Sequence, residues 1–208
     1  IFLREQKPTG GTKGTTVNHI AFAVKDVRQT RDKARAAGYP IVTREEAGAG
    51  DVVTDDISFN KEQGSYSAFA MGPDDIKVQF FEVKSNPTPV ALHHVHFAGP
   101  ATEMRDWYGK VFGAKPGTRG VYNTANLPGV DLSFGQSATP VSGTRGRVLD
   151  HIGFEVQGLA AFCKNLEGMG IKLDRPYTKV PALNISIAFI QDPWGTYIEL
   201  TEGLKDVH

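Results

Sequence analysis

The chain has 208 residues, which suffices for one large domain or two small ones, each with a hydrophobic core. Twenty-three basic residues balance twenty-three acidic ones, and hydrophobic residues make up 40% of the chain. The balanced charge gives no electrostatic case for nucleic acid or an anionic membrane as a partner. No apolar run has the length needed to cross a bilayer, so a transmembrane protein is not expected.

The start of the chain and its single cysteine bear on processing and compartment. Ile1–Arg4 has the pattern of a last strand, and the chain does not begin with Met. We therefore expect that something has been removed upstream. Cys163 cannot form an internal disulfide and is expected to be a buried core thiol. The compartment stays open between the cytoplasm and export after cleavage of an upstream segment.

The first predicted unit covers residues 15–84. It opens with the strand VNHIAFAV (17–24) and continues with a helix that Asp26 caps and Gly38 ends. The segments that follow are short, alternate in polarity and are separated by Gly, Pro and Asn, which is typical of antiparallel strands. We expect residues 1–84 to form a partial domain, made of this unit and the last strand of a missing one.

Two more units follow, at about 91–136 and 147–203. Each has a helix with apolar residues at intervals of three and four, the pattern of an amphipathic helix. These residues are Met104, Trp107, Tyr108, Val111 and Phe112 in the second unit and Leu159, Phe162, Cys163, Leu166 and Met169 in the third. Residues 85–90 are expected to be a linker. Residues 91–208 are expected to be one complete domain, in which these two units share a cup.

The three units are repeats of one pattern. Residues 11–14 (GTKG) and the strand after them reappear as 143–146 (GTRG) followed by VLDHIGFEV, and LHHVHFA (92–98) is a third copy of the strand. The segment AFAMGPDDIKVQFFEV (68–83) likewise parallels AFIQDPWGTYIELTEG (188–203). Each unit is therefore predicted to contain one strand, one helix and then two or three strands.

A repeated unit with a histidine on its first strand, WYGKVFGA on its helix and DPWGTYIEL on its last strand resembles the vicinal oxygen chelate superfamily. That superfamily includes glyoxalase I, extradiol dioxygenases, fosfomycin-resistance enzymes and bleomycin-binding proteins. The resemblance implies an α+β fold, in which paired βαβββ modules form curved mixed sheets around a cup with a divalent metal on its floor. It also implies a homodimer in which the first unit (15–84) completes its cup with a unit of the partner, because domains of this superfamily often exchange units between chains.

Strand alternation predicts which side chains face this cup. Ile152 and Phe154 would pack on the helix, so His151 points into the cup, and the same reasoning directs His94 and Glu199 there. Two imidazoles and one carboxylate suit Zn, Fe, Mn or Ni, with open positions for a substrate. The sequence therefore predicts a metal site of His94, His151 and Glu199, and the resemblance implies that Glu199 is also catalytic as a proton shuttle.

Further residues are candidates for the metal or for a small-molecule substrate. His96 is a candidate fourth ligand or substrate contact, and Asp131 a candidate ligand from the second unit. Tyr122, Asn123, Trp194 and Tyr197 are expected to line the cup. His93 is expected to point the other way.

The first unit provides an internal comparison. His19 is in phase with His151, but Gln79 takes the place of Glu199, and an amide is a poorer ligand than a carboxylate. The first unit is therefore expected to have lost its metal, with His19 packed or hydrogen-bonded.

Several reactions are compatible with a metal and an open cup. The leading hypothesis is a glyoxalase-like lyase or isomerase in which the metal acts as a Lewis acid. The principal alternative is a non-enzymatic binding protein of the bleomycin-resistance type, so whether the chain is an enzyme stays open. An Fe(II) dioxygenase is a second alternative. It is disfavoured because the family's acid–base histidine and tyrosine are replaced here by Val180–Ala182 and Phe189, and a phosphonate pocket is disfavoured because Lys115 and Arg119 alone are too few.

Overall fold

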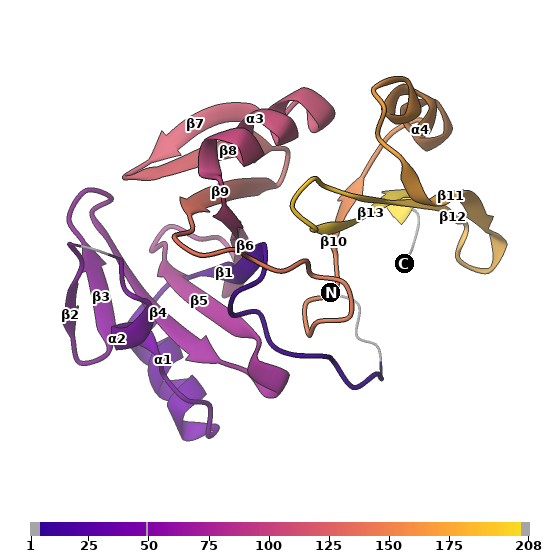
Figure 1. Cartoon of the computed structure of the whole chain (residues 1–208). Coiled ribbons are helices and arrows are strands. Elements are labelled where there is room, and N and C mark those ends of the chain that lie inside the picture. Colours follow the sequence, from indigo (N-terminus) through magenta and orange to yellow (C-terminus); the bar gives the residue numbers. More distant parts are fainter. Residues whose placement is uncertain (1–4, 49, 205–208) are drawn as a thin grey trace.

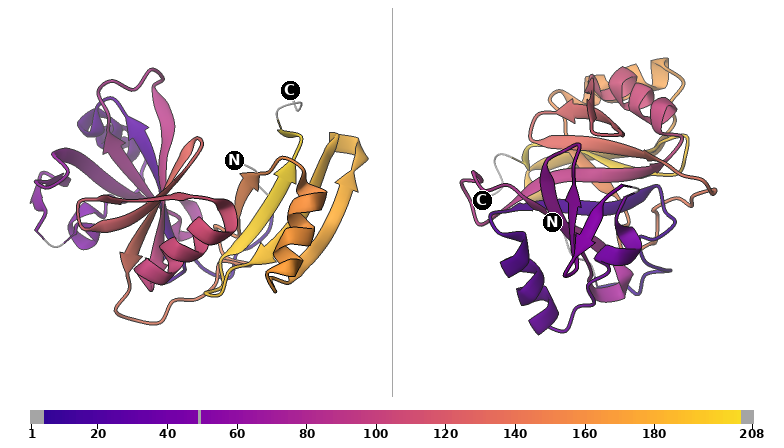
Figure 2. Two further views of the ribbon diagram at one scale, coloured as in Figure 1. Left: turned by 90° about the horizontal axis from the view of Figure 1, so that it is seen from above. Right: turned by 90° about the vertical axis from the view of Figure 1, so that its left-hand side faces the viewer.

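In a computed structural model, which describes residues 5–48 and 50–204, the strands form two mixed sheets (Figure 1). A nine-stranded sheet has the order β2-β3-β4-β5-β1-β6-β9-β8-β7, and a four-stranded sheet has the order β10-β13-β12-β11. Figure 2 shows the larger sheet strongly curled and the smaller one set beside it. No helix in the described ranges is both long and apolar enough to cross a membrane.

The first unit supplies five strands of the larger sheet. Its elements are β1 (Val17–Val24), α1 (Val27–Ala36), α2 (Thr43–Glu46), β2 (Val52–Thr54), β3 (Ile57–Asn60), β4 (Ser65–Met71), the 3-10 turn η1 (Pro73–Asp75) and β5 (Lys77–Glu82). The predicted cap of α1 is confirmed, since the Asp26 carboxylate accepts a hydrogen bond from the backbone N–H of Gln29 at 2.9 Å.

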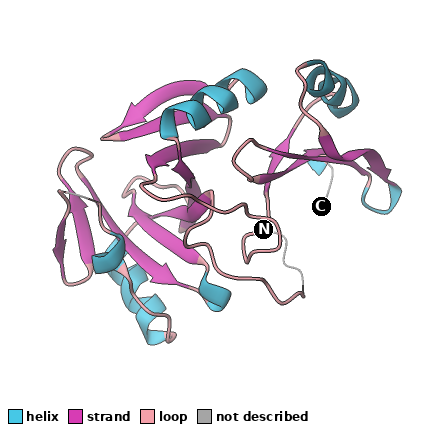
Figure 3. Ribbon diagram, viewed as in Figure 1, coloured by secondary structure: helices cyan, strands magenta, loops and turns pink. Residues whose placement is uncertain are grey.

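The second and third units have the predicted order of one strand, one helix and three strands (Figure 3). The second contains β6 (Val90–Gly99), α3 (Ala101–Phe112), β7 (Lys115–Arg119), β8 (Tyr122–Leu127) and β9 (Val130–Gln136). The third contains β10 (Ile152–Glu155), α4 (Leu159–Gly168), β11 (Leu173–Val180), η2 (Pro181–Leu183), β12 (Ile185–Gln191) and β13 (Tyr197–Glu202). The α+β class with paired modules and curved mixed sheets is therefore confirmed.

The units pair differently from the predicted domain division of 1–84 and 91–208. Strand β1 forms an antiparallel ladder with β6, across the expected linker 85–90. The first and second units thus share one sheet, while the third unit has a sheet of its own. The physical reason is that each unit exposes the edge of its first strand, and any two such edges satisfy each other's backbone hydrogen bonds. The residue pattern within a unit does not specify which other unit is chosen.

The second and third units meet through their apolar cores. One cluster of buried residues includes Met104 and Tyr108 of α3 together with Leu159 and Leu166 of α4. The rings of Phe112 and Phe154 are 4.8 Å apart across this contact. The contact between these two units is therefore made by their helices and the apolar backs of their sheets, and their strands belong to separate sheets.

The repeated GTKG and GTRG segments have equivalent roles. The hydroxyl of Thr12 accepts a hydrogen bond from the backbone N–H of Lys77, which opens β5, and the hydroxyl of Thr144 accepts one from Tyr197, which opens β13, each at 3.0 Å. A Cβ on Gly143 would lie 2.6 Å from a backbone oxygen, so this position has no room for a side chain. The repeat therefore fixes the start of each unit's last strand.

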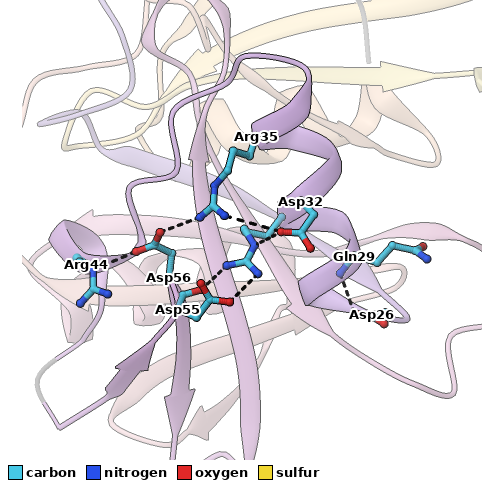
Figure 4. Close-up of polar contacts among 8 residues, drawn as sticks. Asp26, Gln29, Asp32, Arg35, Arg44, Asp55 and Asp56 are labelled. Carbon is cyan, nitrogen blue, oxygen red and sulfur yellow. Dashed lines mark hydrogen bonds and ion pairs between the residues drawn. The ribbon is translucent and has the colours of Figure 1, made fainter.

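Charged side chains hold α1 against the β2–β3 hairpin (Figure 4). Arg31 is only 4% exposed and donates to the backbone carbonyl of Asp55 and, at 3.0 Å, to its carboxylate. Arg35 binds Asp56 at 2.8 Å. Both aspartates have positive φ, of 50° and 53°, a conformation that Asp tolerates in tight turns. The two arginines thus stabilise a strained turn by donating hydrogen bonds to its carboxylates and to one of its carbonyls.

The contact between the second and third units can be tested at Tyr108. Its hydroxyl is fully buried and donates to the Asp192 carboxylate at 3.1 Å. Because Tyr108→Phe leaves a buried carboxylate oxygen without this donor, we expect the free energy of unfolding in urea to fall by about 1–3 kcal/mol. Tyr39→Phe, at a side chain that is 42% exposed, is the matched control and should change it by less than about 0.5 kcal/mol. Equal effects of the two substitutions would contradict the assignment.

Candidate metal centre

Three histidines from two different units meet at the β1–β6 ladder. His19 comes from β1, and His94 and His96 come from β6. One potential ligand nitrogen from each imidazole lies within 4.8 Å of the other two. The rings of His19 and His96 stack with centroids 4.5 Å apart and an interplanar angle of 9°. The antiparallel register, which sets His19 opposite His96, accounts for this stacking.

A small polar cavity of about 110 Å³ opens beside this histidine cluster. Its walls come from both units and combine aromatic rings with groups that form hydrogen bonds. They are Asn18, His19, Glu46, Gln63, Phe69, Gln79, Phe81, His94, His96, Arg119 and Tyr122. Arg119 and Tyr122 flank the β7–β8 turn.

Several buried polar atoms around the cavity lack a hydrogen-bond partner among the described residues. They include Nε2 of His19 and Oε1 of Gln79, whose residues line the cavity, and Oγ of Ser133, whose residue lies opposite His96 in the β6–β9 ladder. Buried polar groups are nearly always satisfied in native proteins, so each such atom calls for an explanation. Their gathering around one cavity indicates that they face something outside the chain, such as a metal ion, ordered water or a ligand.

The strand registers identify the positions equivalent to Glu199. In the third unit Gly153 of β10 lies opposite Glu199 of β13. The corresponding pairs are Ala21 with Gln79 in the first unit and His96 with Ser133 in the second. An amide and a hydroxyl therefore stand in the central cup where the third unit has a carboxylate.

Burial keeps the clustered imidazoles neutral. It holds the pKa of His19 and of His94 well below the usual value and lowers the pKa of His96 to about 3, with nearby Arg119 and Lys77 as further causes for His96. A neutral imidazole has a free lone pair and is the form that binds metals. Three neutral imidazoles are a donor set that Zn, Fe and Ni accept, so the residues present fit a divalent ion.

Two charged pairs border the cluster. Arg119 donates to the Asp131 carboxylate at 2.9 Å, and Lys77 binds Glu46. Each nearby cation is thus paired with an anion, which reduces its repulsion of a divalent ion in the cup. Burial raises the pKa of Asp131 and of Tyr122.

The third unit has a separate histidine–carboxylate pair. Nε2 of His151 lies 3.1 Å from a Glu199 oxygen, and the side chains are 33% and 20% exposed. The contact with Glu199, reinforced by Asp150, raises the pKa of His151. Tyr197 lies on the same face, its ring centroid 6.2 Å from that of His151. The sheet that holds them ends at β10, with no further strand beside it in the described part of the chain.

The predicted ligand set is therefore divided between two places. His151 and Glu199 lie together, whereas His94 clusters with His19 and His96. His19 is packed and hydrogen-bonded as expected, since it is buried and its Nδ1 lies 2.9 Å from Asn18 Oδ1, and its ring is also part of the cluster. The prediction for His93 was wrong. A bulge in β6 leaves His93 unpaired, and its ring stacks on Phe81 at 4.2 Å.

The predicted pocket residues are also divided. His96 and Tyr122 line the central cavity as expected. Asp131 lies opposite His94 in the β6–β9 ladder and is engaged by Arg119. Asn123 bonds instead to Thr102 at the start of α3, since it alternates with Tyr122 along β8. The ring of Trp194 packs against the interior core near Trp107, away from the central cavity.

Sequence reasoning missed several residues of the central cup, namely Asn18, Glu46, Gln63, Phe69, Phe81 and Ser133. The phase of His19 with His151 was a usable signal for the cluster. Ser133 could be found only from the register of β9 against β6.

Comparisons with known proteins agree with this fold. The sequence profile of the Glyoxalase/Bleomycin resistance protein/Dioxygenase superfamily matches residues 91–200. Glyoxalase I from Zea mays is similar in structure in three crystal forms or variants. One mutant is 22% identical with a TM-score of 0.68, covering 94% of this chain and 72% of that chain. The enzyme without a named mutation is 19% identical with a TM-score of 0.63, covering 91% and 68%. A search of curated proteins finds no match.

The chain is built from βαβββ units whose curved sheets enclose a polar cup, and its profile match spans more than half of its length. It belongs to the Glyoxalase/Bleomycin resistance protein/Dioxygenase superfamily.

The buried imidazoles predict a pH dependence of stability. Their pKa values in the folded state lie below the unfolded value of about 6.5, so the unfolded chain binds more protons as the pH falls. Their contribution to stability is therefore present above about pH 6.5 and is lost progressively below it. His151, whose pKa is raised, acts in the opposite direction: its contribution is lost as the pH rises through its folded value.

We expect the urea midpoint of the metal-free protein to fall between pH 7 and 5, and His96→Asn to make this fall shallower. Carboxylates contribute similarly to the pH dependence of wild type and of His96→Asn. The difference between their two curves of urea midpoint against pH therefore reports the contribution of the His96 imidazole. Parallel curves would contradict the assignment.

Proposed function

We propose that this chain is a metal-dependent enzyme of the glyoxalase type, with a divalent ion held by His19, His94 and His96. The observation that supports the proposal is the convergence of two buried imidazoles and one half-buried imidazole, with one ligand nitrogen of each within 4.8 Å of the others. Three protein ligands leave positions open for a substrate, which is the pattern of catalytic rather than structural zinc sites.

When bound, the ion would act as a Lewis acid towards a small molecule that chelates through two neighbouring oxygens. The chain's own residues would select and orient that molecule. The cavity of about 110 Å³ admits only a few non-hydrogen atoms, and its polar walls favour an oxygen-rich substrate. Gln79 and Tyr122 offer hydrogen bonds, and Arg119 places a positive charge where negative charge would develop.

An isomerase or lyase of this type also needs a base to move a proton. In the central cup the equivalent positions hold Gln79 and Ser133, neither of which is a base at neutral pH. We propose that the proton transfer takes place at a second metal centre, of which His151 and Glu199 form half, with Glu199 as its catalytic carboxylate, while the central ion serves to bind a small ligand. The other half of this second centre would come from another βαβββ unit.

The free edge of β10 supports an assembly that completes this second centre. The equivalent strands β1 and β6 use their edges to pair with each other, whereas β10 is bordered on one side only in the described structure. We propose a homodimer in which the third unit, rather than the first, meets a unit of a second copy. The first unit already shares its cup with the second unit of the same chain.

The second candidate function is a non-enzymatic binding protein. It is favoured by the same substitution of Gln79 and Ser133 for carboxylates, since binding a small polar ligand needs no proton shuttle. Metal content separates the two. A binding protein would hold its ligand without stoichiometric metal, and His19→Ala would leave ligand binding intact.

The first test is metal affinity. We expect each of the variants His19→Ala, His94→Ala and His96→Ala to bind Zn²⁺ or Co²⁺ more weakly than wild type. The loss of affinity should exceed about 10–100-fold, which is the typical effect of removing a residue that only contacts a metal ligand. Titration calorimetry and elemental analysis measure this loss. Asn126→Ala is the matched control, because it removes an exposed side chain of the same sheet outside the cluster and should leave this affinity unchanged. Unchanged affinity in all three cluster variants would overturn the proposed centre.

The second test concerns the His151–Glu199 pair. In the metal-loaded wild type we expect turnover of the methylglyoxal–glutathione hemithioacetal, and a dimer in sedimentation velocity. Glu199→Gln should lower kcat by about 100-fold or more, since general acid–base catalysis contributes about that much, without releasing the metal of the central cluster. A monomer whose Glu199→Gln variant retains full turnover would contradict both the dimer and the role of Glu199.

A further inference from the structure

The residue immediately before each of the three repeated histidines contacts that histidine's Nδ1. Asn18 Oδ1 lies 2.9 Å from Nδ1 of His19. Nδ1 of His93 lies 2.7 Å from Nδ1 of His94. The same contact recurs between Asp150 Oδ1 and His151 at 2.7 Å. The contact is thus a property of the repeat, although the partner is an amide in one unit, an imidazole in the next and a carboxylate in the third.

Neighbouring residues of a regular strand cannot make such a contact, because their side chains point to opposite faces. The β1–β6 ladder solves this with two register shifts. Val17 and His19 pair with consecutive residues of β6, so Asn18 is the extra residue on β1. His93 is the extra residue on β6 in the same sense. A bulge re-aims the side chain at its site, and here each bulge turns the extra residue towards the adjacent imidazole.

The contact determines which ring nitrogen is available. When Nδ1–H donates to a neighbour, the proton is fixed there and Nε2 keeps the lone pair. Nε2 of His19 is buried and has no partner among the described residues, so its lone pair is free. For His94 the same result follows if its Nδ1–H donates to Nδ1 of His93. The reverse arrangement would leave both ring nitrogens of His94 unable to bind a metal.

We propose that Asn18 and His93 are positioning residues of the central metal centre, which fix the tautomer and orientation of His19 and His94 so that Nε2 faces the ion. Asp150 has the same role towards His151. This functional role rests on the proposed metal centre. The tautomers of His19 and His94, however, are already set in the metal-free protein and can be measured there. Partners of this kind at metal-binding histidines typically contribute about 10–100-fold to affinity.

The repeat itself supplies the diagnostic substitutions. His93→Asn gives the second unit the partner that the first unit uses, and Asn18→Asp gives the first unit the partner of the third. Both replacements retain an acceptor for Nδ1–H, whereas Asn18→Ala and His93→Ala remove it. Asn126→Ala is the matched control, since Asn126 is an exposed residue on β8 of the same sheet.

Two measurements follow for each variant of the full chain. Nitrogen-15 NMR of the metal-free protein reports the imidazole tautomers, and titration with Co²⁺ reports affinity and the ligand-field spectrum. We expect wild type, Asn18→Asp, His93→Asn and Asn126→Ala to keep the Nδ1–H tautomer of His19 and His94. The two alanine variants should show mixed tautomers at the adjacent histidine and bind Co²⁺ about 10–100-fold more weakly.

The outcomes separate this inference from the proposed function. If wild type binds no Co²⁺, the metal centre fails, and the tautomer data alone decide the roles of Asn18 and His93. Alanine variants that keep the wild-type tautomer, or that bind Co²⁺ as tightly as wild type, overturn the inference. If an alanine variant does not fold, the conservative variants decide: restoration by His93→Asn supports positioning, and weak binding with mixed tautomers in His93→Asn overturns it.

Discussion

The antiparallel ladder between β1 and β6 is the interaction on which the central cup depends. It joins two units into one curled sheet and sets His19 opposite His96 and Ala21 opposite His94. The cluster needs both units, because His19 belongs to β1 whereas His94 and His96 belong to β6. The ladder also contains the two bulges that turn Asn18 and His93 towards their neighbouring histidines. The register of this ladder therefore brings the three histidines together, and its two bulges place Asn18 and His93 against them.

The cluster is costly for a folded chain. Three imidazoles are held neutral by burial, and several polar atoms around them lack partners within the described residues. Unsatisfied buried polar groups oppose folding by about 1–3 kcal/mol each. The apolar contact of α3 with α4, where Tyr108 and Leu159 are fully buried, stabilises the chain away from the cup. A destabilising site that is offset by a well-packed core elsewhere is expected when strained or unsatisfied groups serve binding or catalysis.

The same backbone unit presents different chemistry in each copy. The position that holds Glu199 in the third unit holds Gln79 in the first and Ser133 in the second. Among the described residues, only the third unit therefore has a carboxylate at this strand position, and the first two units share a sheet. The superfamily fold does not decide which of these arrangements performs chemistry. The identity of the side chain at one strand position, and the partner of each first strand, decide it.

The sequence by itself determined the elements, the repeat and the inward faces. Alternation along residues 151–156 directed His151 towards Glu199, and the helical stripes correctly placed Tyr108 and Cys163 in the core. Only the tertiary structure decided which units pair, and so whether His94 meets His151 or His19. The reason is that strand pairing is made by backbone groups, which are the same in every unit. Bulges likewise depend on the partner strand, which is why the position of His93 could not be read from alternation alone.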